Sequence, residues 1–171
     1  MFIRHGEKPP DAGGPPFGIT EDGIQDDHSL IVQGWVRSGA LVGYFSSSHG
    51  NIVAPDYMYG AAYAHGKNSP HGKRPYETVS ALAAARGMSV DARFSVGEEA
   101  ALAADIATRS EQTVLVSWEH HAISTIVQAV TNDPGFSQTW PERFDLVWVL
   151  NWNGNRYDFA LENQHLLHGD Q

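Results

Sequence analysis

The chain has 171 residues, which is the size of a single domain. Its 42% hydrophobic and 18% charged residues are typical of a soluble globular protein. A net charge of -9 argues against nucleic acid or an anionic membrane as the main partner, because both need a basic protein face. The absence of cysteine excludes disulfides and thiolate metal sites, and no apolar run reaches the roughly 18 residues of a transmembrane helix.

The first predicted element is a short strand at residues 1–3, which ends at Arg4, His5 and Gly6. An arginine beside a histidine at the carboxyl end of a strand suits a phosphate group, because guanidinium binds its oxygens in pairs and imidazole can attack phosphorus. Since this candidate site begins at residue 4, we expect no signal peptide and a cytoplasmic location. A buried strand usually has about five residues, so we expect either an upstream extension of the natural chain or an unusually short strand.

Residues 9–28 are predicted to form a loop, because prolines and glycines interrupt them throughout. A long loop directly after such a turn is either a substrate-binding flap or a solvated connector. A helix is expected from Ser29, as its N-cap, to about residue 45, because apolar residues recur there at helical spacing. A short strand around 57–62 and a second polar loop at 64–73 follow.

The next predicted elements alternate between helix and strand. Arg74 precedes Pro75, which favours a helix start at this point, and Gly87 marks the end of that helix. A short strand is expected at 90–94. An alanine-rich helix is expected at 98–109, with acidic residues in its first turn, as the helix dipole prefers.

A continuous apolar run at 113–118 is typical of a strand buried on both faces. A helix with an apolar stripe is expected to begin near His121. A further strand is predicted at 146–150, and Asn153-Gly154 is a strong hairpin signal, so residues 157–160 are expected to return antiparallel.

Strands that alternate with helices predict an α/β fold. We expect a three-layer sandwich with a mostly parallel central sheet, helices on both of its faces and a C-terminal antiparallel hairpin. No repeat or internal boundary divides the chain, so residues 1–171 are predicted to form one domain.

The candidate functional residues are predicted to meet at one edge of this sheet. In such sheets the ligand lies beyond the carboxyl ends of the parallel strands. Arg4 and His5 end the first strand, His120 follows the buried apolar strand, and Arg74 starts a helix that reaches the same edge. The helix that begins near His121 would also direct backbone N–H groups there, which favours an anion.

These residues also carry a family resemblance. The run Arg4-His5-Gly6-Glu7 resembles the Arg-His-Gly signature of the histidine phosphatase superfamily, in its phosphoglycerate mutase-like branch. The run Arg74 to Thr78 resembles the second phosphate arginine of that family with its helical threonine, and residues 114–120 resemble its last core strand and second histidine. The two histidine motifs stand roughly 115 residues apart in the expected order, which makes the pair far more specific than either motif alone.

The resemblance covers nearly the whole chain, with two departures. Residues 164–170 resemble the C-terminal segment of one small-phosphatase branch, of bacterial type. Glu119 stands where a small Ser or Gly is usual, and His121 doubles the histidine. We take His120 as the second site histidine, because it stands three residues before the apolar Ile123, as in the family. Acid branches of the superfamily have Asp in the place of His121, so that variant is disfavoured.

The resemblance implies a phosphomonoester hydrolase that works by double displacement. Neutral His5 would attack phosphorus and form a phosphohistidine, which water then hydrolyses. The other ring N–H of His5 is expected to donate to a backbone carbonyl, which would fix the tautomer. Arg4, Arg74 and His120 would bind the phosphoryl oxygens and balance their charge. Because the arginines supply positive charge, no metal or cofactor is required, and the expected partner is a small phosphorylated substrate or a phosphoprotein.

A leaving alkoxide needs a proton, for which a carboxylic acid is the usual source. Related enzymes often take it from the loop after the third strand, where this chain has Glu98 and Glu99. We favour Glu98, with Glu99, Glu7 and Glu119 as rivals. The alternative is that Glu98 and Glu99 are ordinary acids of a first helical turn.

Two other functions remain open from the sequence. The first is a catalytically weak module on the same fold that binds phospho-ligands or regulates phosphohistidine proteins. The second is a mutase, which is disfavoured because cofactor-dependent mutases of the family are longer and carry a firm acid. A metal cluster of His65 and His71 has no recognised spacing. Trp118 is a candidate for lining the substrate pocket, since it stands two residues before His120.

Overall fold

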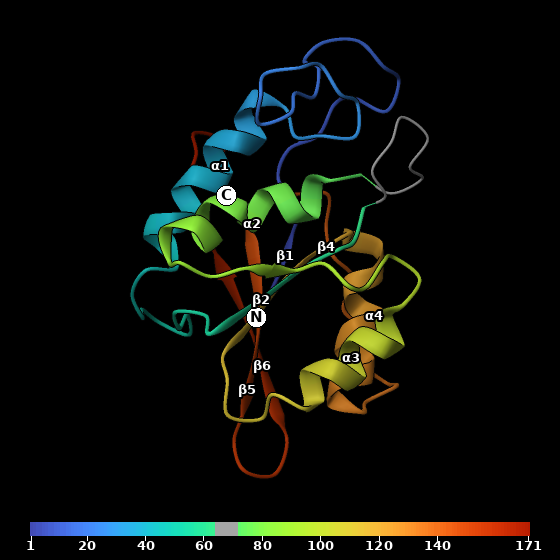
Figure 1. Ribbon diagram of the computed structural model, residues 1–171. Coiled ribbons are helices and arrows are strands. Elements are labelled where there is room, and N and C mark those ends of the chain that lie inside the picture. Colours follow the sequence, from blue (N-terminus) through green and yellow to red (C-terminus); the bar gives the residue numbers. More distant parts are fainter. Residues whose placement is uncertain (64–71) are drawn as a thin grey trace.

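The computed structural model describes residues 1–63 and 72–171 and has a six-stranded sheet between two pairs of helices (Figure 1). The strands are β1 (Phe2–Arg4), β2 (Tyr57–Gly60), β3 (Val90–Asp91), β4 (Val114–Trp118), β5 (Leu146–Trp152) and β6 (Tyr157–Asn163). The helices are α1 (Val32–Tyr44), α2 (Arg74–Ala85), α3 (Glu99–Ala107) and α4 (His120–Thr131). The predicted α/β sandwich with helices on both faces of the sheet is therefore confirmed.

The strand order in the sheet is β3-β2-β4-β1-β5-β6. The pairs β2–β3, β2–β4 and β1–β4 are parallel, whereas β5 runs antiparallel to β1 and forms a hairpin with β6. The predicted C-terminal hairpin is thus present. Because β5 is antiparallel to β1, the loop that precedes it reaches the same edge as the loops that follow β1 and β4.

Two hydrophobic cores lie on opposite faces of the sheet. Helices α1 and α2 cover one face, and α3 and α4 cover the other (Figure 1). Successive residues of β1 point to opposite faces, as pleating requires, so Ile3 enters the first core and Phe2 the second. Trp118, at the end of β4, is fully buried in the second core and donates from its indole to Glu99, so the prediction that it lines a substrate pocket is wrong.

Strand β1 is short but central. All three of its residues are buried, and it pairs with β4 on one side and β5 on the other. Met1 extends this pairing, because its amino group donates to the Val114 carbonyl at 2.7 Å and its carbonyl accepts from the Val116 N–H at 2.9 Å. Neighbours on both sides therefore fix the residues that follow β1 despite its length.

Helix α1 differs from the sequence-based expectation in its start, and its buried face also includes residues that apolar spacing does not predict. Its N-cap is Ile31, whereas the Ser29 hydroxyl donates to Asp26 in the preceding loop at 2.8 Å. The buried face is formed by Gly34, Arg37, Ser38 and Leu41, while Val36 is 55% exposed. The predicted apolar positions Ile31, Leu41 and Phe45 are buried as expected, and a charged residue and a glycine share that inner face.

The remaining elements follow the predictions with shifted ends. The strand expected at 90–94 has only two residues, and the helix expected at 98–109 is shorter at both ends. Residues 9–28 contain neither a helix nor a named strand, as predicted. Most of the loop expected at 64–73 lies outside the described residues. The longest helix in the described ranges has 13 residues, and none has the length and apolar character to cross a membrane.

Candidate functional site

The site is built where β1 and β4, neighbours in the sheet, end side by side. Arg4 at the end of β1 stands opposite Trp118 at the end of β4, and the His5 N–H donates to the Trp118 carbonyl at 3.1 Å. His5 follows Arg4 directly, and His120 follows Trp118 after one residue, Glu119. The sheet register therefore delivers both predicted histidines to one edge.

His5 is buried and held in one tautomer. Its Nδ1 lies 2.8 Å from the Gly6 carbonyl oxygen, which can only accept, so Nδ1 carries the proton. This is the backbone hydrogen bond that the sequence predicted. Burial, with smaller effects of Arg74, Arg4 and His120, lowers the pKa of His5 to about 3. His5 is therefore neutral near pH 7, with an unprotonated Nε2.

The turn after His5 is tied to the first turn of α2. The Gly6 N–H donates to the Thr78 hydroxyl at 2.8 Å, and that hydroxyl donates to the Arg74 carbonyl at 2.7 Å. One threonine thus connects the segment that carries His5 with the helix start that carries Arg74. This links two of the sequence motifs by direct contacts.

Both predicted arginines present N–H groups without partners. Arg4 is 2% exposed, its Nη1 donates to Glu142 at 3.2 Å, and its guanidinium carbon lies 4.1 Å from the centre of the Phe144 ring. Arg74 donates from Nη1 to the Asp27 carbonyl at 3.2 Å. Among the described residues, the buried Nε atoms of both arginines have no hydrogen-bond partner. Buried donors of this kind are rare in proteins, and two of them at one edge suit an anionic ligand.

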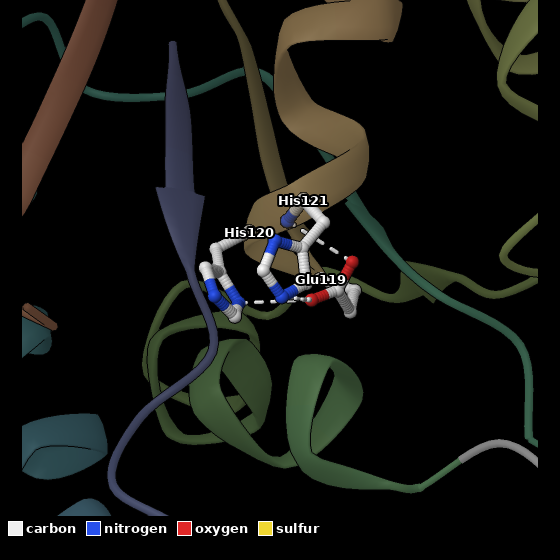
Figure 2. Close-up of side chains that lie close together, drawn as sticks. All are labelled: Glu119, His120 and His121. Carbon is white, nitrogen blue, oxygen red and sulfur yellow. Dashed lines mark hydrogen bonds and ion pairs between the residues drawn. The ribbon is translucent and has the colours of Figure 1, made fainter. Parts of the chain in front are cut away.

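The two consecutive histidines have different environments (Figure 2). His120 is buried, and its Nε2 lies 2.9 Å from Oε1 of Glu142, whereas the His121 side chain is 78% exposed. Burial and the Arg4 guanidinium lower the pKa of His120, although Glu142 and Glu119 act in the opposite direction. His120, not His121, therefore shares a carboxylate partner with Arg4.

Glu142 is the site residue that sequence reasoning missed. Its carboxylate bridges Arg4 Nη1 and His120 Nε2, and its side chain is 76% exposed. The hydrogen bond from His120 and the charge of Arg4 lower its pKa. Glu142 reaches this edge because β5 is antiparallel to β1. The only signal in the sequence was an acidic residue just upstream of a predicted strand whose direction was left open.

Of the predicted carboxylates, two are held by other partners. Glu7 accepts from both Nε and Nη2 of Arg37, at 3.1 and 2.7 Å. Glu99 is buried and accepts from the Gly97 N–H at 2.9 Å and from the Trp118 indole at 3.2 Å. These contacts give both carboxylates structural roles.

The other two predicted carboxylates lie nearer to solvent. Glu98 is exposed and accepts from the Ser95 N–H at 2.8 Å. Within residues 1–63 and 72–171, no hydrogen bond or ion pair joins it to the arginines and histidines of the site. Glu119 is the N-cap of α4 and accepts from the His121 N–H at 3.0 Å. The His121 N–H, at the helix start that was expected to face an anion, therefore already donates to Glu119.

A buried ion network supports the turn from behind. Arg37 of α1 contacts Glu7, Gln164 and Asp170, so it joins the segment after His5 to the C-terminal segment. The Arg37 and Asp170 side chains are only 2% and 7% exposed. Burial alone would raise the pKa of Asp170, but hydrogen bonds from Arg37 and from backbone N–H groups lower it to about 2.

We expect Arg37→Met to destabilise the protein by about 3–5 kcal/mol, because it leaves the buried carboxylates of Glu7 and Asp170 without their cation. Urea unfolding measures the loss. The matched control is Arg93→Met, which removes a 58% exposed arginine that also pairs with two carboxylates, Asp91 and Asp105. A loss for Arg37→Met no larger than that of the control would contradict a stabilising role for the network.

A cavity of about 320 Å³ lies at the opposite end of the sheet, with Met1, Val114 and Trp152 among its lining residues, and includes none of the site residues.

No protein-family model matches the chain, and a search of curated proteins returns no match. The chemistry of the edge at His5 is therefore inferred from its own side chains.

Proposed function

We propose that the protein is a phosphomonoester hydrolase of the histidine phosphatase type, which forms a phosphohistidine on His5. The observation that carries this proposal is the neutral imidazole of His5, fixed by Gly6, at the edge where Arg4, Arg74 and His120 converge. A nucleophile, two guanidinium groups and a second imidazole are a complete set for phosphoryl transfer.

In the first step, the lone pair of His5 Nε2 attacks phosphorus while the bond from phosphorus to the ester oxygen breaks. The proton on Nδ1 stays on Nδ1, because it is held by the Gly6 carbonyl. In the second step, water attacks the phosphohistidine, inorganic phosphate leaves, and neutral His5 is restored. The low pKa of His5 keeps the nucleophile unprotonated well below pH 6.5.

A substrate phosphate would displace the bridging carboxylate of Glu142 from Arg4 and His120. Glu142 occupies the same Arg4 and His120 donors that would bind phosphoryl oxygens. A dianionic phosphate carries more charge than one carboxylate and can use the free Nε donors of both arginines as well. We therefore assign Glu142 the role of an internal anion that leaves when substrate binds.

For the leaving-group proton, Glu98 stays the proposed donor. It lies in the segment that follows β3 and is exposed, whereas Glu7 and Glu99 are held by Arg37 and Trp118. A carboxyl group that is open to solvent can take up a proton between turnovers.

The second candidate function is a catalytically weak module that binds a phosphorylated ligand. The occupied state of Arg4 and His120 favours it, because an internal carboxylate slows access to the site. The complete set of His5 and its three partners favours catalysis, since binding alone does not need a neutral nucleophile. A mutase remains disfavoured.

The test is turnover of p-nitrophenyl phosphate by the protein as purified, measured with and without EDTA. We expect saturable turnover that EDTA does not change, because the arginines supply the charge that a metal would otherwise bring. Loss of turnover with EDTA would contradict the metal-independent mechanism. An inert protein that still binds orthovanadate would support the binding module instead.

A further inference from the structure

The first turn of α4 gathers three metal-ligating groups (Figure 2). They are the Glu119 carboxylate and the imidazoles of His120 and His121, and one ligand atom from each lies within 4.8 Å of the others. The Glu119 carboxylate contacts the backbone through one oxygen and lies nearest the rings through the other. Its Oε2 accepts from the His121 N–H, while its Oε1 lies 2.8 Å from His120 Nδ1 and 4.0 Å from His121 Nε2.

One nitrogen of this cluster, Nδ1 of His120, lacks a hydrogen-bond partner among the described residues. The His120 side chain is 8% exposed, and Nδ1 itself is buried. Its other nitrogen, Nε2, is already committed to the Glu142 carboxylate, to which it can only donate. Nδ1 is therefore the nitrogen with a free lone pair, and a carboxylate oxygen lies 2.8 Å from it. Two atoms that both present lone pairs repel each other at this distance unless a proton or a metal ion lies between them.

The direction of the contact distinguishes a metal ion from a proton. A hydrogen-bond acceptor lies along the N–H bond, and Glu119 Oε1 does not, since it forms no hydrogen bond at 2.8 Å. Two ligands of one tetrahedral Zn²⁺, each about 2.0–2.2 Å from it, lie about 3.3–3.6 Å apart. The off-axis oxygen is thus poorly placed to share a proton, and a small movement of the Glu119 side chain, which is 30% exposed, would place it to share a metal ion.

We propose that Glu119, His120 and His121 form a site for a divalent transition metal such as Zn²⁺. Two imidazoles and one carboxylate are a ligand set that Zn²⁺ favours, with a fourth position left for water. His121 is 78% exposed, so its ring can turn to close the 4.0 Å gap without disturbing the core. The ion takes Nδ1 of His120 and leaves Nε2–H directed at Glu142. This site does not depend on the proposed phosphatase function, which needs no metal.

The test is calorimetric titration of Zn²⁺ into the chelator-treated full chain, in buffer without phosphate. We expect a saturable site in the wild type that His121→Gln weakens at least about tenfold, since even partners outside the ligand shell are worth about 10–100-fold. The matched control is His168→Gln, which removes another exposed histidine and should leave binding unchanged. Binding in His121→Gln that equals the wild type, or a wild-type Kd weaker than on the order of 1 mM, would overturn the proposal.

A second readout identifies the ligand atom. In protein with ¹⁵N-labelled histidine, Zn²⁺ should shift the Nδ1 resonance of His120 by coordination, while Nε2 keeps its proton. A coordination shift at Nε2 of His120, or at histidines other than 120 and 121 only, would assign the ion to a different site. Neither measurement uses enzyme activity, so failure of the metal site and failure of the proposed function are distinguishable.

Discussion

Replacement of His5 by asparagine is expected to lower turnover of p-nitrophenyl phosphate by roughly three to six orders of magnitude, the scale of losing a catalytic nucleophile. Asparagine can still donate a hydrogen bond to the Gly6 carbonyl, as His5 Nδ1 does. It has no lone pair at the position of Nε2. The substitution therefore removes the nucleophile and keeps the contact that orders the turn.

The measurement is kcat/KM for the aryl ester, with circular dichroism to show that the variant is folded. The matched control is His49→Asn, which changes a histidine in the segment before β2, at the other end of the sheet. Its activity should equal that of the wild type. If His5→Asn retains more than about a tenth of wild-type turnover, the nucleophile is not His5.

Replacement of Arg74 by glutamine is expected to lower kcat/KM by one to two orders of magnitude or more. A charge-assisted hydrogen bond contributes about 1.5–3 kcal/mol, and each 1.4 kcal/mol is about tenfold. Within residues 1–63 and 72–171, the guanidinium makes one hydrogen bond, to the Asp27 carbonyl, and its Nε has no partner. The fold should therefore tolerate the change, while phosphoryl binding should not.

The control for Arg74→Gln is Lys73→Gln, because it removes one positive charge from the adjacent residue. Lys73 pairs with Asp26 at 3.4 Å, and its side chain is 33% exposed. We expect this variant to change kcat/KM by less than about threefold, as for a screened surface charge. Equal losses in the two variants would mean that Arg74 acts through general electrostatics and not by contact with the phosphoryl group.

The fold could be predicted because its signals are local. The apolar run of β4 and the Asn153-Gly154 turn each specify their own structure from a few neighbouring residues. The edge where the strands end then follows from the topology of a parallel sheet. This is why the positions of Arg4, His5 and His120 at one edge could be predicted.

The supporting contacts could not be predicted, because they depend on residues far apart in the sequence. The burial of Arg37 needs Glu7 and Asp170, which are 30 residues before it and 133 residues after it. Apolar periodicity has no signal for a buried ion pair. It therefore predicts the apolar part of the inner face of α1 but not the burial of Arg37 on that face.

Glu142 depends on a different long-range fact, the direction of β5. A parallel β5 would carry the preceding loop to the opposite end of the sheet, and Glu142 would not meet Arg4. Strand direction is set by pairing with β1, which the sequence of the strand does not encode locally.

The most direct measurement for the central proposal is trapping of the phosphoenzyme. The protein is mixed with p-nitrophenyl phosphate and quenched in alkali, in which phosphohistidine is stable, and the phosphorylated peptide is sequenced by mass spectrometry. The proposal predicts one acid-labile phosphoryl group, on His5. A phosphoryl group on another residue, or turnover in which no phosphoenzyme forms, would contradict it.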